Sequence, residues 1–173
     1  MKIVSDQLQR LFRDWEVRHR SLYPKRRDFD PVDFRYILGQ MSIIEIHREP
    51  LRFLYRLQGS GMTRYLGFDI TGKFMDEAPN RAWAALACKH LEEVATTGVP
   101  SVASHFDQLV DDHLWNLEAL VLPISRDGTT LDMLISAIAH HKRASWITAA
   151  VNPHTEIKKL DAPQRHPVYE FGP

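Results

Sequence analysis

Three glycines that follow a strand-like segment are the first residues whose spacing could bind a phosphate. Gly59 and Gly61 come directly after the segment RFLYRLQ, and Gly67 follows them. A dinucleotide fingerprint needs the spacing G-x-G-x-x-G at the start of a helix, because the glycines let the backbone approach the pyrophosphate. Here the third glycine comes too late, and the chain has no G-x-x-x-x-G-K-[ST] loop. The sequence therefore gives no support to nucleotide binding.

Histidines and paired aspartates are the other residue types that could do chemistry. The histidines of the C-terminal half have no H-E-x-x-H or comparable spacing; they are His105, His113, His140 and His141. Asp111 and Asp112 are adjacent, and adjacent residues of a strand or turn rarely point at one substrate. We therefore predict no metal site, no catalytic residue and no enzyme activity.

Length and charge exclude several function classes. The 173 residues are enough for one domain, and Lys+Arg and Asp+Glu are equal at 22 each. A net charge of zero predicts no binding to nucleic acid or to an anionic membrane, and the short basic run Lys25 to Arg27 is too small to change this. No apolar stretch is long enough for a signal peptide or a membrane span, so we predict a cytoplasmic protein.

An amphipathic helix is predicted at the N-terminus, within residues 1–22, with Ser5 or Asp6 as its cap. Its apolar stripe consists of Leu8, Leu11, Phe12 and Trp15. This stripe must be buried, either on the open face of the chain's own sheet or against a second copy. We predict that it forms the interface of a homodimer.

The remaining elements predict an α+β domain. A second helix over 31–38 follows the cap Asp30, and a longer one runs over 80–97. Strands are expected over 41–47, 52–58, 101–109, 114–125 and 130–140, with a tight turn at Asp127-Gly128. Strands and helices that do not alternate indicate a five-stranded antiparallel sheet with helices on one face. The domain is expected over 23–143, and a proline-containing tail over 144–173.

A set of short motifs in this order resembles the PAS domain. The motifs are Gly59, Leu66-Gly67, Thr71-Gly72-Lys73 and Asp76-Glu77, preceded by YPKRRDFDPVDFRYILGQMSIIEI and followed by LVLPISRDG. The N-terminal stretch narrows the resemblance to a compact, stand-alone bacterial PAS subfamily. The resemblance covers about Tyr23 to Ala139, and it departs from the usual pattern at Ser136, where typical members often have glycine.

The resemblance implies a sheet with helices closed over a cavity that holds a small molecule. Side-chain alternation and helical spacing then select the residues expected to face this cavity: Ile44, Ile46, Phe53, Tyr55, Met62, Tyr65, Phe74, Trp83, Leu86, His90, Trp115, Leu117, Met133 and Ile135. An apolar cleft with a few polar groups is the usual form of a ligand site. The alternative is that these side chains fill the space and leave a packed core.

His90 is the residue that could bind a cofactor, but it does not determine which one. Some haem-binding PAS domains take the iron ligand from this helix, but a buried histidine that is hydrogen-bonded to a backbone carbonyl is the commoner arrangement. The flavin-binding cysteine motif of the light-sensing members is absent, since Cys88 lies in no such context. The cofactor is therefore left unidentified.

The family mostly senses and dimerises, so the resemblance implies a cytoplasmic sensory module that relays its state to a separate signalling partner. Two alternatives stay open. The first is a small α+β enzyme with a cone-shaped pocket that uses His90 or a nearby tyrosine as acid or base, and the second is a structural adaptor with a filled core.

Overall fold

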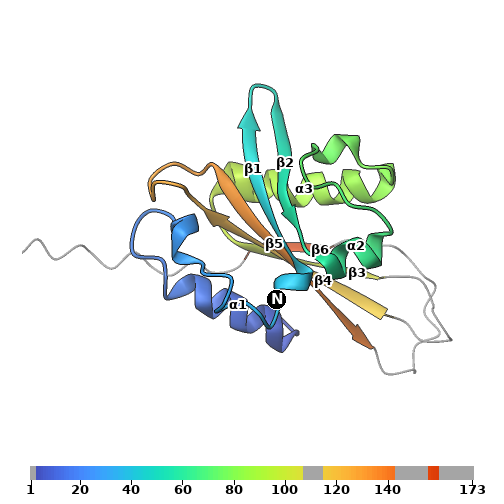
Figure 1. The fold of residues 1–173 in the computed structure, drawn as a ribbon, viewed down its shortest axis with the longest axis horizontal. Helices are drawn as coiled ribbons and strands as arrows, with labels where there is room; N and C mark the ends of the chain where they lie inside the picture. Colours follow the sequence, from blue (N-terminus) through green and yellow to red (C-terminus); the bar gives the residue numbers. More distant parts are fainter. Residues whose placement is uncertain (1–2, 107–114, 143–155, 160–173) are drawn as a thin grey trace, which may run out of the picture.

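The computed structural model describes residues 3–106, 115–142 and 156–159, and its centre is an antiparallel sheet (Figure 1). The strands are β1 (Met41–Arg48), β2 (Leu51–Gln58), β3 (Ser101–Phe106), β4 (Trp115–Ile124), β5 (Met133–Lys142) and β6 (Glu156–Lys159). Their order in space is β2-β1-β5-β4-β3-β6, and all neighbouring pairs are antiparallel. The predicted α+β class with a five-stranded antiparallel sheet is confirmed, and β6 extends that sheet at the β3 edge.

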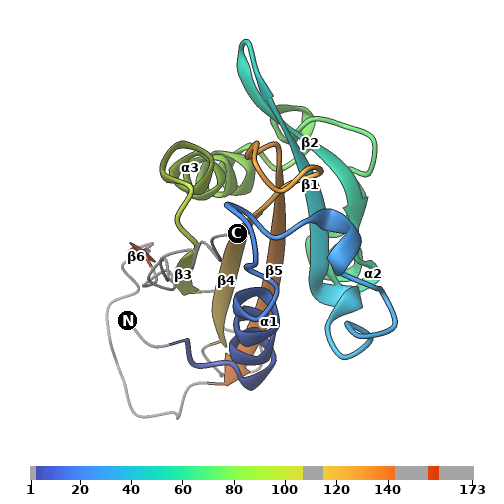
Figure 2. The same cartoon turned by 90° about the vertical axis from the view of Figure 1, so that its left-hand side faces the viewer.

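The N-terminal helix α1 (Asp6–Glu16) covers one face of the sheet (Figure 2). Ser5 caps it as predicted, because its Oγ accepts a hydrogen bond from the backbone N–H of Leu8 at 3.3 Å. Leu8, Leu11 and Trp15 are all buried among apolar side chains of β4 and β5. The helix therefore belongs to the core of its own chain.

This placement changes the expectation of a dimer interface on the N-terminal helix. A single copy of the chain buries Leu8, Leu11 and Trp15, which leaves at most 1% of any of these side chains exposed. Phe12, the fourth residue of the predicted interface, is half-buried. Of the two surfaces that could bury the stripe, the structure has the chain's own sheet. The homodimer itself stays a prediction.

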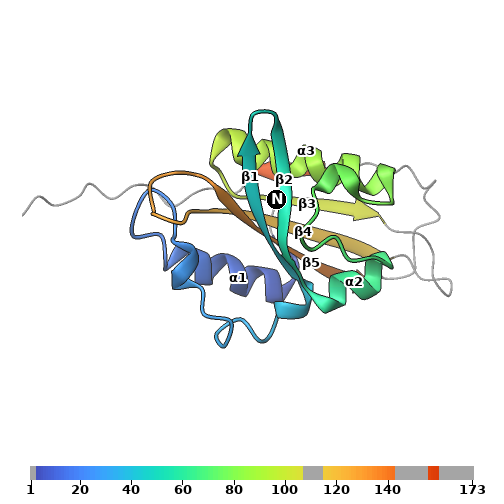
Figure 3. The same cartoon turned by 45° about the horizontal axis from the view of Figure 1, so that its top comes forward.

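The other face of the sheet is covered by the remaining helices, on the side opposite α1 (Figures 1 and 3). These are α2 (Ser60–Leu66), the 3-10 helix η3 (Met75–Glu77) and α3 (Arg81–Thr97). Asn80 begins α3, since its side chain accepts a hydrogen bond from the N–H of Trp83 at 3.0 Å. Gly98 ends it with a positive φ of 67°, a conformation that glycine adopts readily. Both ends agree with the prediction of a helix over 80–97.

The chain between α1 and β1 forms turns, so the predicted α-helix over 31–38 is wrong. The structure has two short 3-10 helices here, η1 (Arg26–Asp28) and η2 (Leu38–Gln40), with turns between them. Asp30 does cap the first turn, but Phe34 and Ile37 are buried under α1. A segment this short gains little stability from helix formation alone. The burial of Phe34 and Ile37 therefore determines its backbone conformation.

The connection between β4 and β5, residues 125–132, is longer than the tight turn that Asp127-Gly128 predicts. Asp127 organises it, because its Oδ1 accepts hydrogen bonds from the backbone N–H groups of Thr130 and Thr129 at 2.9 and 2.7 Å. These bonds hold the pKa of the Asp127 carboxyl well below its ordinary value. Gly128 has a φ of 94°, so the positive backbone angle expected at this glycine is present.

The strand β6 comes from the segment that was predicted to be a tail. It pairs with β3, for example through Ala103 and Ile157. The rest of that segment, residues 143–155 and 160–173, lies outside the described residues. The domain boundaries drawn from the sequence therefore stay predictions, with one strand of the tail joined to the sheet.

The glycine pair that resembled a phosphate loop brings two backbone segments close together. A Cβ on Gly59 would overlap the carbonyl oxygens of Leu38 and Gly39, and a Cβ on Gly61 would lie 2.7 Å from the oxygen of Gly39. The N–H of Gly59 also donates to the carbonyl of Met41 at 2.8 Å. The glycines therefore serve the packing of α2 against η2 and β1.

Gly59→Ala should lower the free energy of unfolding by about 1–3 kcal/mol, because the new methyl group has to displace backbone rather than a mobile side chain. Urea unfolding measures this loss. Ser60→Ala, at the exposed next position, is the matched control and should change stability by no more than about 0.5 kcal/mol. Equal losses in the two variants would contradict the close approach.

No helix in the described part of the chain is long and apolar enough to cross a membrane. The cytoplasmic location expected from the sequence stays a prediction. The expectation that the chain does not bind nucleic acid also stays a prediction.

Candidate functional site

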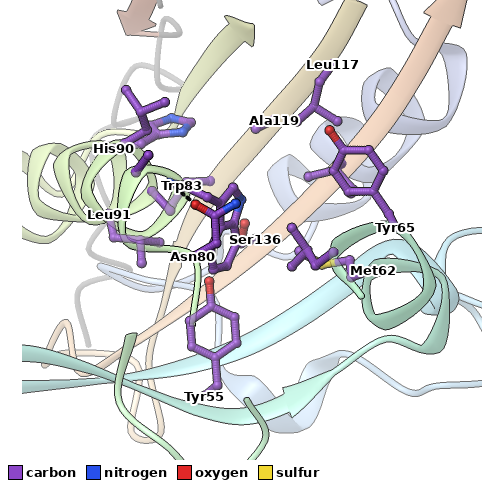
Figure 4. A pocket seen from close by; sticks show the side chains of 16 residues that line it. Tyr55, Met62, Tyr65, Asn80, Trp83, His90, Leu91, Leu117, Ala119 and Ser136 are labelled. Carbon is purple, nitrogen blue, oxygen red and sulfur yellow. Dashed lines mark hydrogen bonds between the residues drawn. The ribbon is translucent and has the colours of Figure 1, made fainter. Parts of the chain in front are cut away.

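A cavity lies between the sheet and the helices α2 and α3 (Figure 4). Its volume is about 390 Å³, within the range of about 300–1,000 Å³ that is typical of ligand pockets. The lining residues are Tyr55 from β2, Leu117, Ala119 and Val121 from β4, Ser136 and Ile138 from β5, Met62, Tyr65 and Leu66 from α2, and Asn80, Ala82, Trp83, Leu86, Ala87, His90 and Leu91 from α3 and its cap.

The periodicities of strand and helix explain why these residues meet. Leu117, Ala119 and Val121 are two residues apart in β4, so they point to one face of the sheet. Trp83, Ala87 and Leu91 are four residues apart in α3 and therefore lie on one face of that helix. Alanine in the middle of the strand leaves room that a larger side chain would fill.

The structure brings together some of the residues that the sequence predicts to line the pocket. The predicted residues that line the cavity are Tyr55, Met62, Tyr65, Trp83, Leu86, His90 and Leu117. Tyr55 and Met62 are each only 2% exposed, whereas Leu86 is 43% exposed. The cavity thus reaches from the buried core to the surface of α3. Ligand binding by these residues stays a prediction.

The other predicted pocket residues lie elsewhere. Ile44, Ile46 and Phe53 are on the expected face, but they belong to a packed apolar cluster and do not line the cavity. Phe74 forms an isolated antiparallel β-bridge with Leu54 of β2 and does not line the cavity. The side chain of Trp115 lies outside the described residues.

Met133 and Ile135 face the opposite side of the sheet from the one predicted. Both are buried in the cluster under α1, and Ser136 and Ile138 are the residues of β5 that line the cavity. The strand is covered on both faces, and from Met133 to Ala139 only Ser136 is polar, so alternation in its sequence cannot tell one face from the other. The prediction for β5 is therefore wrong by one residue.

Several lining residues were not predicted: Leu66, Asn80, Ala82, Ala87, Leu91, Ala119, Val121, Ser136 and Ile138. Some of them could have been found. A period of two from Leu117 gives Ala119, and the helical period from Trp83 gives Leu91. Only the topology of the sheet places Ser136 here.

Of the described residues, those that line the cavity include no Asp, Glu, Lys or Arg. Its polar groups are the hydroxyls of Tyr55, Tyr65 and Ser136, the amide of Asn80 and the imidazole of His90. Burial raises the pKa of Tyr55 far above its ordinary value, and the neighbouring Cys88 adds to the shift. The Tyr55 hydroxyl therefore keeps its proton at neutral pH, and it points into the cavity (Figure 4).

His90 is held by a hydrogen bond to the sheet. Its Nε2 lies 2.6 Å from the Oγ of Ser101 on β3, and both residues are buried. This matches the commoner of the two predicted arrangements, with a hydroxyl in place of the expected carbonyl. An axial histidine must offer a nitrogen to the iron, and Nε2 is already engaged here. The residues present therefore do not fit a haem bound through His90.

Metal and thiol chemistry also find no support in the part of the chain that the structure describes. No group of three or more His, Cys, Asp or Glu residues there could hold a metal ion. The ring of His140 packs edge-on against Tyr65, with ring centroids 4.4 Å apart. The side chains of His105 and His141, and all of Asp111, Asp112 and His113, lie outside the described residues. Burial raises the pKa of the Cys88 thiol to about 11, so it is a poor nucleophile at neutral pH.

Comparisons with known proteins agree with this fold. A family model described as PAS domain matches residues 3–138. The comparison with curated proteins gave no match. Among solved structures, the crystal structure of the Vibrio cholera VqmA–ligand–DNA complex is similar at 14% identity with a TM-score of 0.48, over 64% of this chain and 49% of that chain. The chain thus spans about half of that protein, and a likeness at this TM-score carries no argument about function.

Proposed function

The chain belongs to the PAS domain family, and on this premise we propose that it is a sensory module that binds one small, uncharged molecule in the cavity between the sheet and α3. The observation that carries the proposal is the cavity itself, with a volume of about 390 Å³ and no charged side chain among the described residues that line it. A charged ligand would lose its hydration here without gaining an ionic partner. A mainly apolar ligand would gain from burial against Trp83, Leu91 and Leu117.

A ligand in this position would contact α3 and the central strands at the same time. Binding would therefore favour one packing of the helix on the sheet over another, which is how a ligand shifts a population. Leu86 and Tyr65 border the cavity and are 43% and 40% exposed. We propose that a separate signalling partner contacts this rim. If the chain forms a homodimer, the interface lies away from the buried stripe of α1.

Ala119→Phe should weaken binding strongly, because the larger side chain projects into the cavity from the middle of β4 and takes up space that the ligand needs. Native mass spectrometry of the protein as purified measures bound mass that is lost on denaturation. Titration with naphthalene, an uncharged apolar probe, tests the cavity if the protein is purified empty. The variant should still unfold cooperatively, at a cost of about 1–3 kcal/mol for overpacking.

The matched control is Ala85→Phe, which places the same side chain on the exposed face of α3, away from the cavity. It should bind as the unmodified chain does. Equal binding by Ala119→Phe and Ala85→Phe would contradict the proposed site. Failure of the unmodified protein to bind either a co-purified molecule or naphthalene would support the adaptor with a closed core.

A further inference from the structure

Tyr55 brings a hydrogen-bonding group to an apolar part of the cavity. It lies on β2 opposite Ile44 of β1, and it is 2% exposed. Its hydroxyl points into the cavity (Figure 4). No hydrogen bond joins this hydroxyl to any of the residues that the structure describes.

Ser136 adds a second hydroxyl from another strand. It lies on β5, paired with Ser42 of β1 and Val121 of β4, and it is 8% exposed. It lines the same cavity, and within the described part of the chain its hydroxyl also makes no hydrogen bond. Figure 4 shows Ser136 and Asn80 on the side of the cavity toward which the Tyr55 hydroxyl points. The Asn80 oxygen is used by the N–H of Trp83, which leaves its amide nitrogen as a further donor.

Buried polar groups in folded proteins are nearly always hydrogen-bonded, and an unmet hydroxyl in an apolar environment is costly. The hydroxyls of Tyr55 and Ser136 have no partner among the described residues and are open to one cavity, so polar atoms of its occupant can bond to them. Among the residues that the structure describes, no lysine or arginine lines the cavity, so they offer no partner to an anion. The described lining also contains no aspartate or glutamate, so it offers no partner to a cation.

We infer that the ligand is a neutral molecule with an apolar body and at least one hydrogen-bond acceptor, such as a carbonyl oxygen or an aromatic ring nitrogen, which accepts a hydrogen bond from the Tyr55 hydroxyl beside Ser136. This inference rests on the proposed function, because it specifies the ligand of the same cavity. Trp83 and Leu91, which line the cavity from α3, contact the apolar body. Shape and apolar burial supply most of the affinity, and the hydroxyl pair selects the acceptor.

Two probes of nearly identical shape test the inference. Quinoline carries one ring nitrogen acceptor, naphthalene carries none, and the buffer is chosen so that quinoline is uncharged. Tyr55→Phe removes only the hydroxyl. It should weaken quinoline binding by about three- to tenfold, the value of one net hydrogen bond, while naphthalene binding stays equal or tightens. Ligand-observed NMR titrations give both dissociation constants.

Tyr36→Phe is the matched control, since Tyr36 packs against the cluster on the α1 side and bonds to Asp14. It should change neither probe's affinity. A second readout is stability in the absence of any probe. Because the Tyr55 hydroxyl has no partner in the described part of the protein, Tyr55→Phe should unfold at the same temperature as the unmodified chain or at a higher one.

The outcomes separate the inference from the proposed function. If naphthalene binds but Tyr55→Phe leaves the quinoline constant unchanged, or weakens both probes equally, the inference is overturned and the apolar cavity still stands. A marked loss of stability in Tyr55→Phe without a probe would also overturn it, because the hydroxyl would then have a partner within the protein. If neither probe binds the unmodified chain, both the cavity proposal and the inference fail.

Discussion

Trp15→Ala should lower the free energy of unfolding by about 3–5 kcal/mol, the usual cost of truncating a large aromatic side chain in a core. Trp15 is 1% exposed and lies between α1 and the sheet. Its Nε1–H donates to the carbonyl oxygen of Pro123 at 2.8 Å, so truncation removes a buried hydrogen bond as well as packing. Native domains are stable by only about 5–15 kcal/mol. Urea unfolding followed by far-UV circular dichroism measures the loss.

Two further variants of α1 should lose less stability than Trp15→Ala. Trp15→Phe keeps most of the buried apolar area but loses the bond to Pro123, so its cost should be smaller. Phe12→Ala truncates a half-buried ring and should also cost less than Trp15→Ala. The mass of the protein in solution should be the same for all three variants. A change of mass at unchanged stability would mean that the stripe faces a second copy after all.

The elements that the sequence predicts well are those whose ends carry local signals. Asn80 and Gly98 delimit α3 because one caps the first turn and the other accepts a positive φ. The hairpin of β1 and β2 was predicted because two β-rich segments flank the turn at Glu49 and Pro50. Such signals act over a few residues, so the sequence alone contains them. The loop after β4 also carries a local signal, Asp127-Gly128, but the bonds that Asp127 accepts from Thr129 and Thr130 organise a longer loop than the predicted tight turn.

The candidate site was harder to predict, because it depends on which face of each strand turns inward. In β2 the expected alternation gave Tyr55 correctly. In β5 both faces are buried, so the same rule selected Met133 and Ile135 and missed Ser136. In the sequence, that serine stands out only as a departure from the glycine of similar chains. Its place in the cavity follows from the register of β5 with its two neighbours, which no single segment shows.

Glu118 is the clearest case of a buried residue whose burial cannot be inferred from the sequence. It lies in β4 among apolar residues, where a charged side chain would ordinarily mark the face turned to water. In the structure it is 2% exposed, because the N-terminal segment covers that face. Its carboxylate accepts hydrogen bonds from the backbone N–H groups of Val4 and Ser5, at 2.9 and 2.8 Å. A negative charge at the start of α1 is also favourable to the helix dipole.

Glu118→Ala should therefore lower the free energy of unfolding by about 2–4 kcal/mol, because it removes the acceptor of two N–H groups just before α1, one of which, that of Ser5, is buried. Glu118→Gln should cost less, since one side-chain oxygen still accepts. The matched control is Glu92→Ala on the exposed face of α3, which should change stability by no more than about 0.5 kcal/mol. Urea unfolding measures all three, and hydrogen exchange at Ser5 reports the bond directly. Unchanged exchange at Ser5 in Glu118→Ala would show that the carboxylate does not hold the N-terminal segment to β4.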